Sequence, residues 1–125
     1  MIAAVLADYP EAARAYANRL ATLIREEAVR LKAGPLTETL KWGEPAFLTE
    51  ATKSGTTIRM AWSPKAPDML QMLVPCQTSL VDTWRDRFPE LRYAGDRAVL
   101  LPLGAPLPEV ALRSCIALAL TYHRR

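Results

Sequence analysis

Apolar residues recur at helical spacing over the first quarter of the chain, and charged residues fall mostly between them. Asp8 and Glu11 flank Tyr9-Pro10 in a pattern typical of a helix start, and Gly34-Pro35 is typical of a helix end. We therefore predict a helix from about Tyr9 to that point. A short second helix is predicted over 36–41, ending at Gly43. The buried positions predicted for the long helix are Ala13, Tyr16, Leu20, Leu23, Ile24 and Leu31.

Two further helices are predicted in the second half of the chain. One is capped by Thr78 or Ser79 and closes at Pro89. The other follows the prolines at 106 and 108, and its apolar content over 110–122 indicates burial against a sheet. The stripe expected to be buried in the first of them is Leu80, Val81, Trp84 and Phe88.

Between the helices the pattern is typical of strands. Segments 46–50 and 56–62 flank a polar turn and predict one hairpin, and 91–93 with 98–103 predict another. Segment 69–74 is apolar on both sides, as in a central strand. We predict an α+β domain with a mainly antiparallel sheet of about five strands, made of two hairpins and a central strand, with N-terminal, middle and C-terminal helices.

Composition narrows the class of protein. The 125 residues, half of them hydrophobic, suit a single domain over 1–125. The net charge is +3 and the pI is about 9.1, but the basic residues are scattered rather than clustered, which argues against a nucleic-acid surface. The apolar start meets Asp8 too early for a signal peptide, and no apolar run is long enough to cross a membrane. With two cysteines and no secretory signal, we expect a cytoplasmic protein with free thiols.

Few catalytic chemistries fit the residue inventory. The only histidine, His123, would have to serve as the base of any Ser-His or Cys-His pair. Its position near the end of a predicted helix favours a different role, as a cation that interacts with the helix dipole. One histidine and two distant cysteines do not make a usual zinc site. The glycines lie at boundaries and turns, not in a phosphate-binding loop. We predict that the protein is not an enzyme.

The stretch Leu40-Lys-Trp-Gly-Glu-Pro-Ala-Phe47 has two interpretations. In the architectural one, Trp42 anchors the edge of the sheet or the core, Gly43 ends the preceding helix, and Pro45 starts an edge strand. In the functional one, Lys41, Trp42 and Glu44 line a binding site. Lys41 is a nucleophile only if it is desolvated or lies beside another cation, and its stem otherwise packs on the tryptophan ring.

Arg59 and Cys76 complete the candidate ligand-binding residues. Arg59 lies opposite the apolar face of its strand, so it is either an ordinary solvent-side residue or the floor of an anion-binding groove. Cys76 precedes a predicted helix, where backbone dipoles lower a thiol pKa; the alternative is a half-buried thiol at a strand–helix junction. Cys115 lies in an apolar stretch and is expected to be inert core.

From about Pro35 to the C-terminus, the chain resembles the YdhG-like family of bacterial domains of unknown function. This resemblance implies a compact α+β fold and, for some members, a frataxin-like role as an intracellular iron chaperone. None of the shared motifs is a catalytic signature. The segments that carry the resemblance are Leu40-Lys-Trp-Gly-Glu-Pro-Ala-Phe47, Thr57-Ile-Arg59, Cys76-Gln-Thr-Ser-Leu-Val-Asp-Thr-Trp84, Pro89-Glu-Leu, Gly95-Asp-Arg-Ala98, Ala111-Leu-Arg-Ser-Cys-Ile116 and Leu120-Thr-Tyr-His123.

The leading functional prediction is a non-enzymatic module that binds an unknown small molecule or protein without a cofactor. The alternative is an iron chaperone that binds Fe(II) through surface carboxylates such as Glu38, Glu44 and Glu50. A homodimer through an exposed strand or the apolar last helix fits either function.

Overall fold

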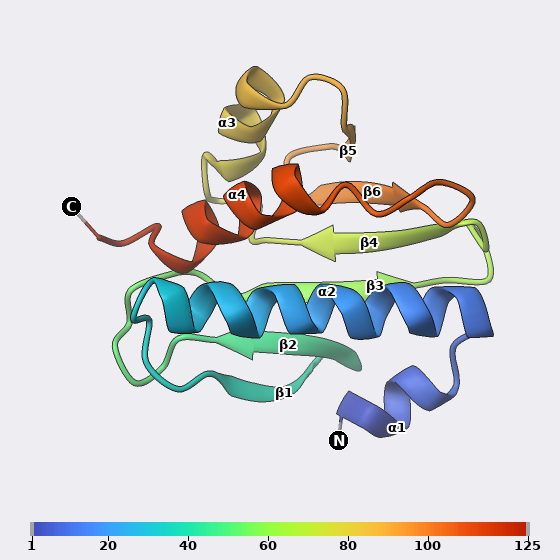
Figure 1. Cartoon of the computed structure of the whole chain (residues 1–125), viewed down its shortest axis with the longest axis horizontal. Helices are drawn as coiled ribbons and strands as arrows, with labels where there is room; N and C mark the ends of the chain where they lie inside the picture. The colour runs from blue at the N-terminus through green and yellow to red at the C-terminus, as the bar shows by residue number, and fades with distance from the viewer. Residues whose placement is uncertain (1, 125) are drawn as a thin grey trace.

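Residues 2–124, which the structure describes, form a six-stranded antiparallel sheet and four helices in the computed structural model (Figure 1). This confirms the predicted α+β class, and the predicted number of strands is close to that observed. The helices are α1 (Ile2–Ala7), α2 (Glu11–Arg30), α3 (Leu80–Arg87) and α4 (Glu109–Leu120). The strands are β1 (Thr37–Lys41), β2 (Glu44–Leu48), β3 (Ile58–Trp62), β4 (Met69–Leu73), β5 (Arg92–Ala94) and β6 (Ala98–Pro102).

The strands lie in the order β1-β2-β3-β4-β6-β5, and each neighbouring pair is antiparallel. Both predicted hairpins are present, as β2–β3 and β5–β6. The strand predicted to be central, β4, lies between β3 and β6. The chain leaves β4 through α3 and returns through β5, so β1 and β5 form the two edges of the sheet.

The helices cover one face of the sheet, and the core lies between the two layers (Figure 1). Side chains alternate across a strand, so every second residue faces the helices. Each apolar side chain removed from water there contributes about 1.5–3 kcal/mol. The strand residues buried on this face are Phe47, Ile58, Met60, Leu70, Met72, Val99 and Leu101. From the helices, Leu20, Leu23, Ile24, Trp84, Leu112, Cys115 and Ile116 meet them.

The predicted short helix over 36–41 is wrong, because this segment is strand β1. The β-branched Thr37 and Thr39 favour an extended backbone, and a six-residue helix gains little to offset its nucleation cost. The segment instead pairs along its whole length with β2, from Thr37 opposite Leu48 to Lys41 opposite Glu44.

The first residues form a short helix, α1, that the sequence pattern did not predict. Ile2 and Leu6 lie one turn apart and are buried in the common core. Tyr9, just after α1, packs its ring against that of Trp62 with centroids 6.1 Å apart. The helix therefore extends the apolar layer over the β1–β2 end of the sheet, as Figure 1 shows.

Candidate functional site

The second face of the sheet, which we call the open face, is not covered by any of the four helices in residues 2–124. Glu38 and Phe47 are directly opposite each other in the β1–β2 pair, and Arg25 of α2 reaches both of them. The helices therefore lie on the Glu38–Phe47 side. Residues that alternate with these two, such as Glu44 and Arg59, face the other way.

A depression of about 330 Å³ lies at the open face. The tip of the β1–β2 hairpin borders it on one side, and the segment that follows β4 borders it on another. The residues that line it are Lys41, Trp42, Thr57, Arg59, Val74, Pro75, Cys76, Gln77 and Arg97.

Four of the five predicted ligand-binding residues line this depression: Lys41, Trp42, Arg59 and Cys76. The fifth, Glu44, is not in the lining but forms an ion pair with Arg59. The structure therefore brings together residues that lie up to 35 positions apart in the chain.

Arg59 lines the depression from strand β3. Its side chain is 19% exposed, and its Nη1 donates to Oε1 of Glu44. Ala46 is opposite Arg59 in the β2–β3 pair, so Glu44, two residues earlier on the same face, meets Arg59 diagonally. A guanidinium carries five N–H donors, and one carboxylate oxygen does not use them all. Arg59 can therefore serve both as a structural partner of Glu44 and as a donor to an anion.

Two further cations, Lys41 and Arg97, line the depression. Lys41 and Arg97 are exposed, and neither has an ion-pair partner among the described residues. The Val74 N–H donates to the Arg97 carbonyl oxygen at 2.8 Å, which fixes the backbone of Arg97 beside β4. With Arg59, three cationic side chains line the depression, and Glu44 supplies one nearby carboxylate. The site has an excess of positive charge.

Trp42 is not an anchor of the core, and the architectural interpretation of this residue is wrong. Its side chain is 89% exposed. Trp42 and Gly43 form the two-residue turn between β1 and β2, with φ of 57° and 76°, and a type I′ hairpin turn requires positive φ at both of these positions. The turn points the indole away from the core, and its ring borders the depression.

Cys76 is a free, half-buried thiol in the segment between β4 and α3. This position fits the predicted strand–helix junction, and the thiol also borders the depression. Cys115 is fully buried in the core, and burial raises the pKa of its thiol to about 12. At neutral pH Cys115 therefore holds its proton.

Sequence reasoning missed Thr57, Gln77 and Arg97 as lining residues. Arg97 lies in the turn between β5 and β6, where the sequence shows only an ordinary turn cation. It joins the site because β6 pairs with β4. Gln77 and Thr57 had a weak signal, since Gln77 adjoins Cys76 and Thr57 lies two residues before Arg59 on the same strand face.

The carboxylates considered for iron do not meet. Glu38 lies on the helix side and is bound by Arg25 at 2.6 and 2.8 Å, which holds its pKa below the usual range. Glu44 lies on the open face with Arg59. Across residues 2–124, no group of three or more His, Cys, Asp or Glu side chains is placed to hold a metal ion.

Comparisons with protein-family models, with curated proteins and with solved structures found no match to the chain. In the described part of the chain, no helix combines the length and the apolar character needed to cross a membrane.

Proposed function

We propose that this protein is a non-enzymatic binding domain that holds a small organic anion with a flat apolar part on its open face. One observation carries the proposal: three cationic side chains, Lys41, Arg59 and Arg97, converge on one depression beside an exposed tryptophan. Their excess charge favours an anion, and the Trp42 ring offers a stacking surface for the apolar part.

The size of the depression supports a small ligand. A volume of about 330 Å³ is at the lower end of the range for small-molecule sites. Thr57 and Gln77 add neutral polar side chains to the lining, which can orient the ligand by hydrogen bonds. Arg59 is held in place by Glu44 before any ligand arrives, so little side-chain entropy is lost at that residue on binding.

Two further predictions, membership of the YdhG-like family and an iron-chaperone role, are also proposals. Membership of the YdhG-like family rests on the motifs from Pro35 onward, of which the 40–47 stretch forms the hairpin tip described above. The Fe(II) chaperone role would need a carboxylate site, which anaerobic Fe(II) titration of the protein and of its Glu44→Gln variant would detect.

The test is titration of the protein with 1-naphthoate, followed by amide chemical shifts in NMR, with the uncharged 1-naphthamide as the matched ligand. We expect 1-naphthoate to shift the amides of Thr57 and Gln77 saturably, and 1-naphthamide to bind more weakly. Arg97→Gln should weaken binding up to about tenfold, the effect of losing one charged contact worth about 1.4 kcal/mol. Trp42→Ala should weaken binding and leave the melting temperature unchanged.

The control variant is Lys65→Gln, which removes an exposed cation outside the depression. It should bind 1-naphthoate like the parent protein. The proposal fails if 1-naphthoate gives no saturable shifts around the depression, or if Lys65→Gln weakens binding as much as Arg97→Gln does. A loss of stability in Trp42→Ala would instead return this residue to an architectural role.

A further inference from the structure

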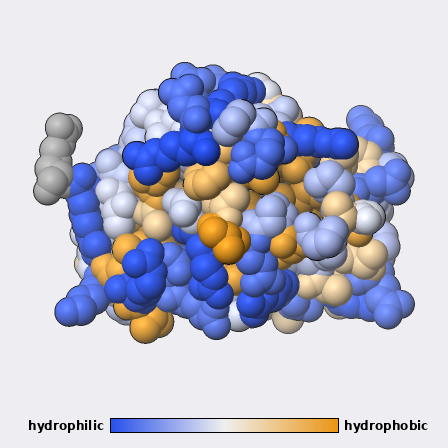
Figure 2. All heavy atoms as spheres, turned by 45° about the horizontal axis from the view of Figure 1, so that its top comes forward, coloured by the Kyte–Doolittle hydropathy of each residue, from blue (hydrophilic) through white to orange (hydrophobic). Residues whose placement is uncertain are grey.

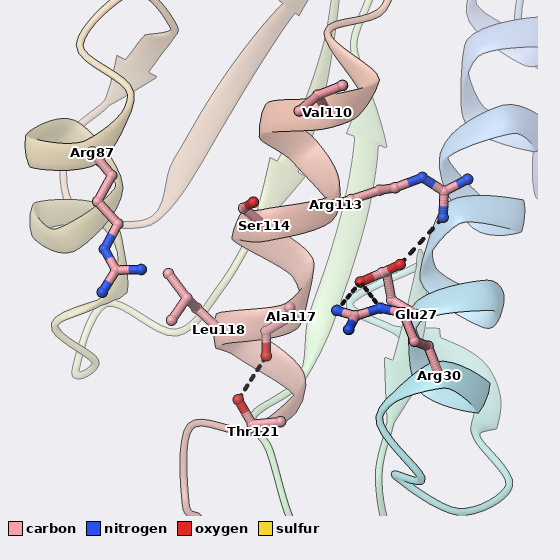
Figure 3. A pocket seen from close by; sticks show the side chains of 9 residues that line it. All are labelled: Glu27, Arg30, Arg87, Val110, Arg113, Ser114, Ala117, Leu118 and Thr121. Carbon is pink, nitrogen blue, oxygen red and sulfur yellow. Dashed lines mark hydrogen bonds and ion pairs between the residues drawn. The ribbon is translucent and has the colours of Figure 1, made fainter.

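A second depression, of about 590 Å³, lies on the helix side of the molecule where α2, α3 and α4 meet (Figure 3). We call it the α4 groove and define it by Arg30, Arg87, Arg113, Ser114, Ala117 and Leu118. It shares no residue with the depression on the open face. Its occupant and its chemistry are therefore independent of the function proposed above.

Two arginines on one side of the groove are held by a buried carboxylate. Glu27 is only 4% exposed, and its Oε1 accepts from Nε and Nη2 of Arg30 at 3.0 and 2.6 Å. Its Oε2 accepts from Nη1 of Arg113 at 3.2 Å, and Glu26 accepts from Nη2 of Arg113 at 2.7 Å. Figure 3 shows the Arg30 and Arg113 side chains converging on Glu27 from α2 and α4. Both guanidiniums are thus ordered in advance, which lowers the entropic cost of binding.

Arg87 lies on the opposite side of α4. It extends from α3, is exposed, and has no ion-pair partner among residues 2–124. Cations therefore flank α4 from both sides, and the three arginines of the groove outnumber the two carboxylates, Glu26 and Glu27, that pair with Arg30 and Arg113. An acidic occupant would neutralise this excess.

The floor of the groove is made of small and apolar side chains. The small side chains of Ser114 and Ala117 leave space on the surface of α4 between the arginines. Leu118, on the same helix, is half-buried. Val110, at the start of the helix, is 85% exposed. Figure 2 turns the α3 end toward the viewer and shows apolar residues interrupted by hydrophilic ones rather than one apolar patch. A partner must therefore match both charge and apolar contact.

We propose that the α4 groove docks an acidic segment of a partner protein, with carboxylates placed against the arginines and an apolar side chain on the Ala117–Leu118 floor. Arginine is the residue that best pairs carboxylates in a bidentate way, and the floor offers apolar area between the pairs. Among residues 2–124, no aromatic side chain lines the groove, so these residues do not offer the stacking surface on which single-stranded nucleic acid depends.

The test is fluorescence anisotropy with a labelled synthetic peptide of Glu-Glu-Leu repeats, and with Gln-Gln-Leu repeats as the matched peptide. We expect the acidic peptide to bind more tightly, with an affinity that falls as salt is added. Arg87→Glu should weaken binding about tenfold or more, and Ser114→Glu, which places a negative charge on the floor, should do the same. Neither variant removes a partner of Glu27, so both should melt like the parent protein.

Arg92→Glu is the control, because it makes the same charge change at an exposed β5 position outside the groove. It should bind the acidic peptide within about twofold of the parent protein. The proposal is overturned if Arg92→Glu and Arg87→Glu weaken binding equally, or if the Gln peptide binds as tightly as the Glu peptide. Displacement of the acidic peptide by oligo-dT at lower concentrations than by unlabelled peptide would also overturn it, in favour of nucleic acid. If Lys41→Gln abolishes peptide binding, the peptide lies on the open face instead.

Discussion

Glu27 illustrates how a single residue can depart from its pattern in a helix. Charged residues of the long helix α2 were expected to fall mostly outside its buried stripe, yet the Glu27 carboxylate is nearly inaccessible to water. Its hydrogen bonds to Arg30 lower its pKa, burial opposes that shift, and Arg113 adds to the lowering. Burial without these partners would be strongly unfavourable. The two arginines thus make the buried position tolerable.

We predict that Glu27→Gln lowers the free energy of unfolding by about 1–3 kcal/mol at neutral pH, because the charged hydrogen bonds are lost. A lowered pKa in the folded state means that the carboxylate stabilises the fold above its ordinary pKa of 4.5. This stabilisation is lost as the pH falls through the lower, folded-state pKa. Urea denaturation at neutral pH and at about pH 3 should therefore show a difference that shrinks in acid.

Glu50→Gln is the matched control, since Glu50 is exposed, lies outside the helices and has no ion-pair partner in the described chain. Its stability should follow that of the parent protein at both pH values. Equal destabilisation of Glu27→Gln at neutral and acid pH would show that packing, and not charge, is what the substitution removes.

Among the elements, those with a strong periodic pattern were predicted and those that depend on pairing were not. The long helix, the β2–β3 and β5–β6 hairpins and the central strand follow from alternation and turn residues. Strand β1 was missed because Trp42 occupies a turn position usually taken by Asn or Asp. Gly43 fits the second turn position, but a glycine there is equally typical of a helix end.

The candidate site was predictable to a similar extent. Lys41, Trp42 and Arg59 belong to neighbouring segments with recognisable features, and Cys76 follows a clear strand. Arg97 was not predictable, because its place depends on β6 pairing with β4 across an intervening helix and strand. Such an order of strands is set by the packing of the whole sheet and not by local residues.

The loop between β2 and β3 shows how one element depends on another. Gly55 lies against the end of α4, and a Cβ there would come within 2.4 Å of the carbonyl oxygen of Ala119. The Thr56 N–H donates to that same oxygen at 2.9 Å, and Ser54 Oγ donates to the Leu120 carbonyl at 2.9 Å. The loop is therefore hydrogen-bonded to the backbone at the end of α4, and the contact leaves no room for a side chain at Gly55.

We predict that Gly55→Ala lowers the free energy of unfolding by about 1–3 kcal/mol, because the loop and α4 must move apart. Gly104→Ala is the control: its Cβ would meet nothing within 4 Å, so its effect should be within about 0.5 kcal/mol. Thermal and urea denaturation of both variants measure this. If Gly55→Ala is as stable as Gly104→Ala, the loop does not pack tightly on α4 in solution.

Within the molecule as a whole, the two cysteines lie in different parts of the fold. Cys76 borders the open face, whereas Cys115 lies in the core between helices and sheet. Only the thiolate reacts quickly with disulfide reagents, and the raised pKa of Cys115 suppresses it. Reaction at Cys115 therefore requires the two layers to separate.

We predict that the native protein reacts with a disulfide reagent at one thiol, Cys76, and that the second thiol reacts only as fast as the core opens. Urea should bring both into the fast phase. Cys76→Ser should remove the fast phase and leave the slow one, as stopped-flow absorbance can measure. Rapid reaction of both thiols without urea would contradict a closed core.

Because the helices of residues 2–124 cover only one face of the sheet, the other face can change its ligand specificity separately from the core. Along β3, Ile58 and Met60 are fixed by the core, whereas Arg59 and Ala61, which alternate with them, face outward. Substitution at the outward positions leaves the packed layer intact, so evolution can alter recognition there without loss of the fold. The same five-residue strand thus holds positions fixed by the core and positions that face outward, one beside the other.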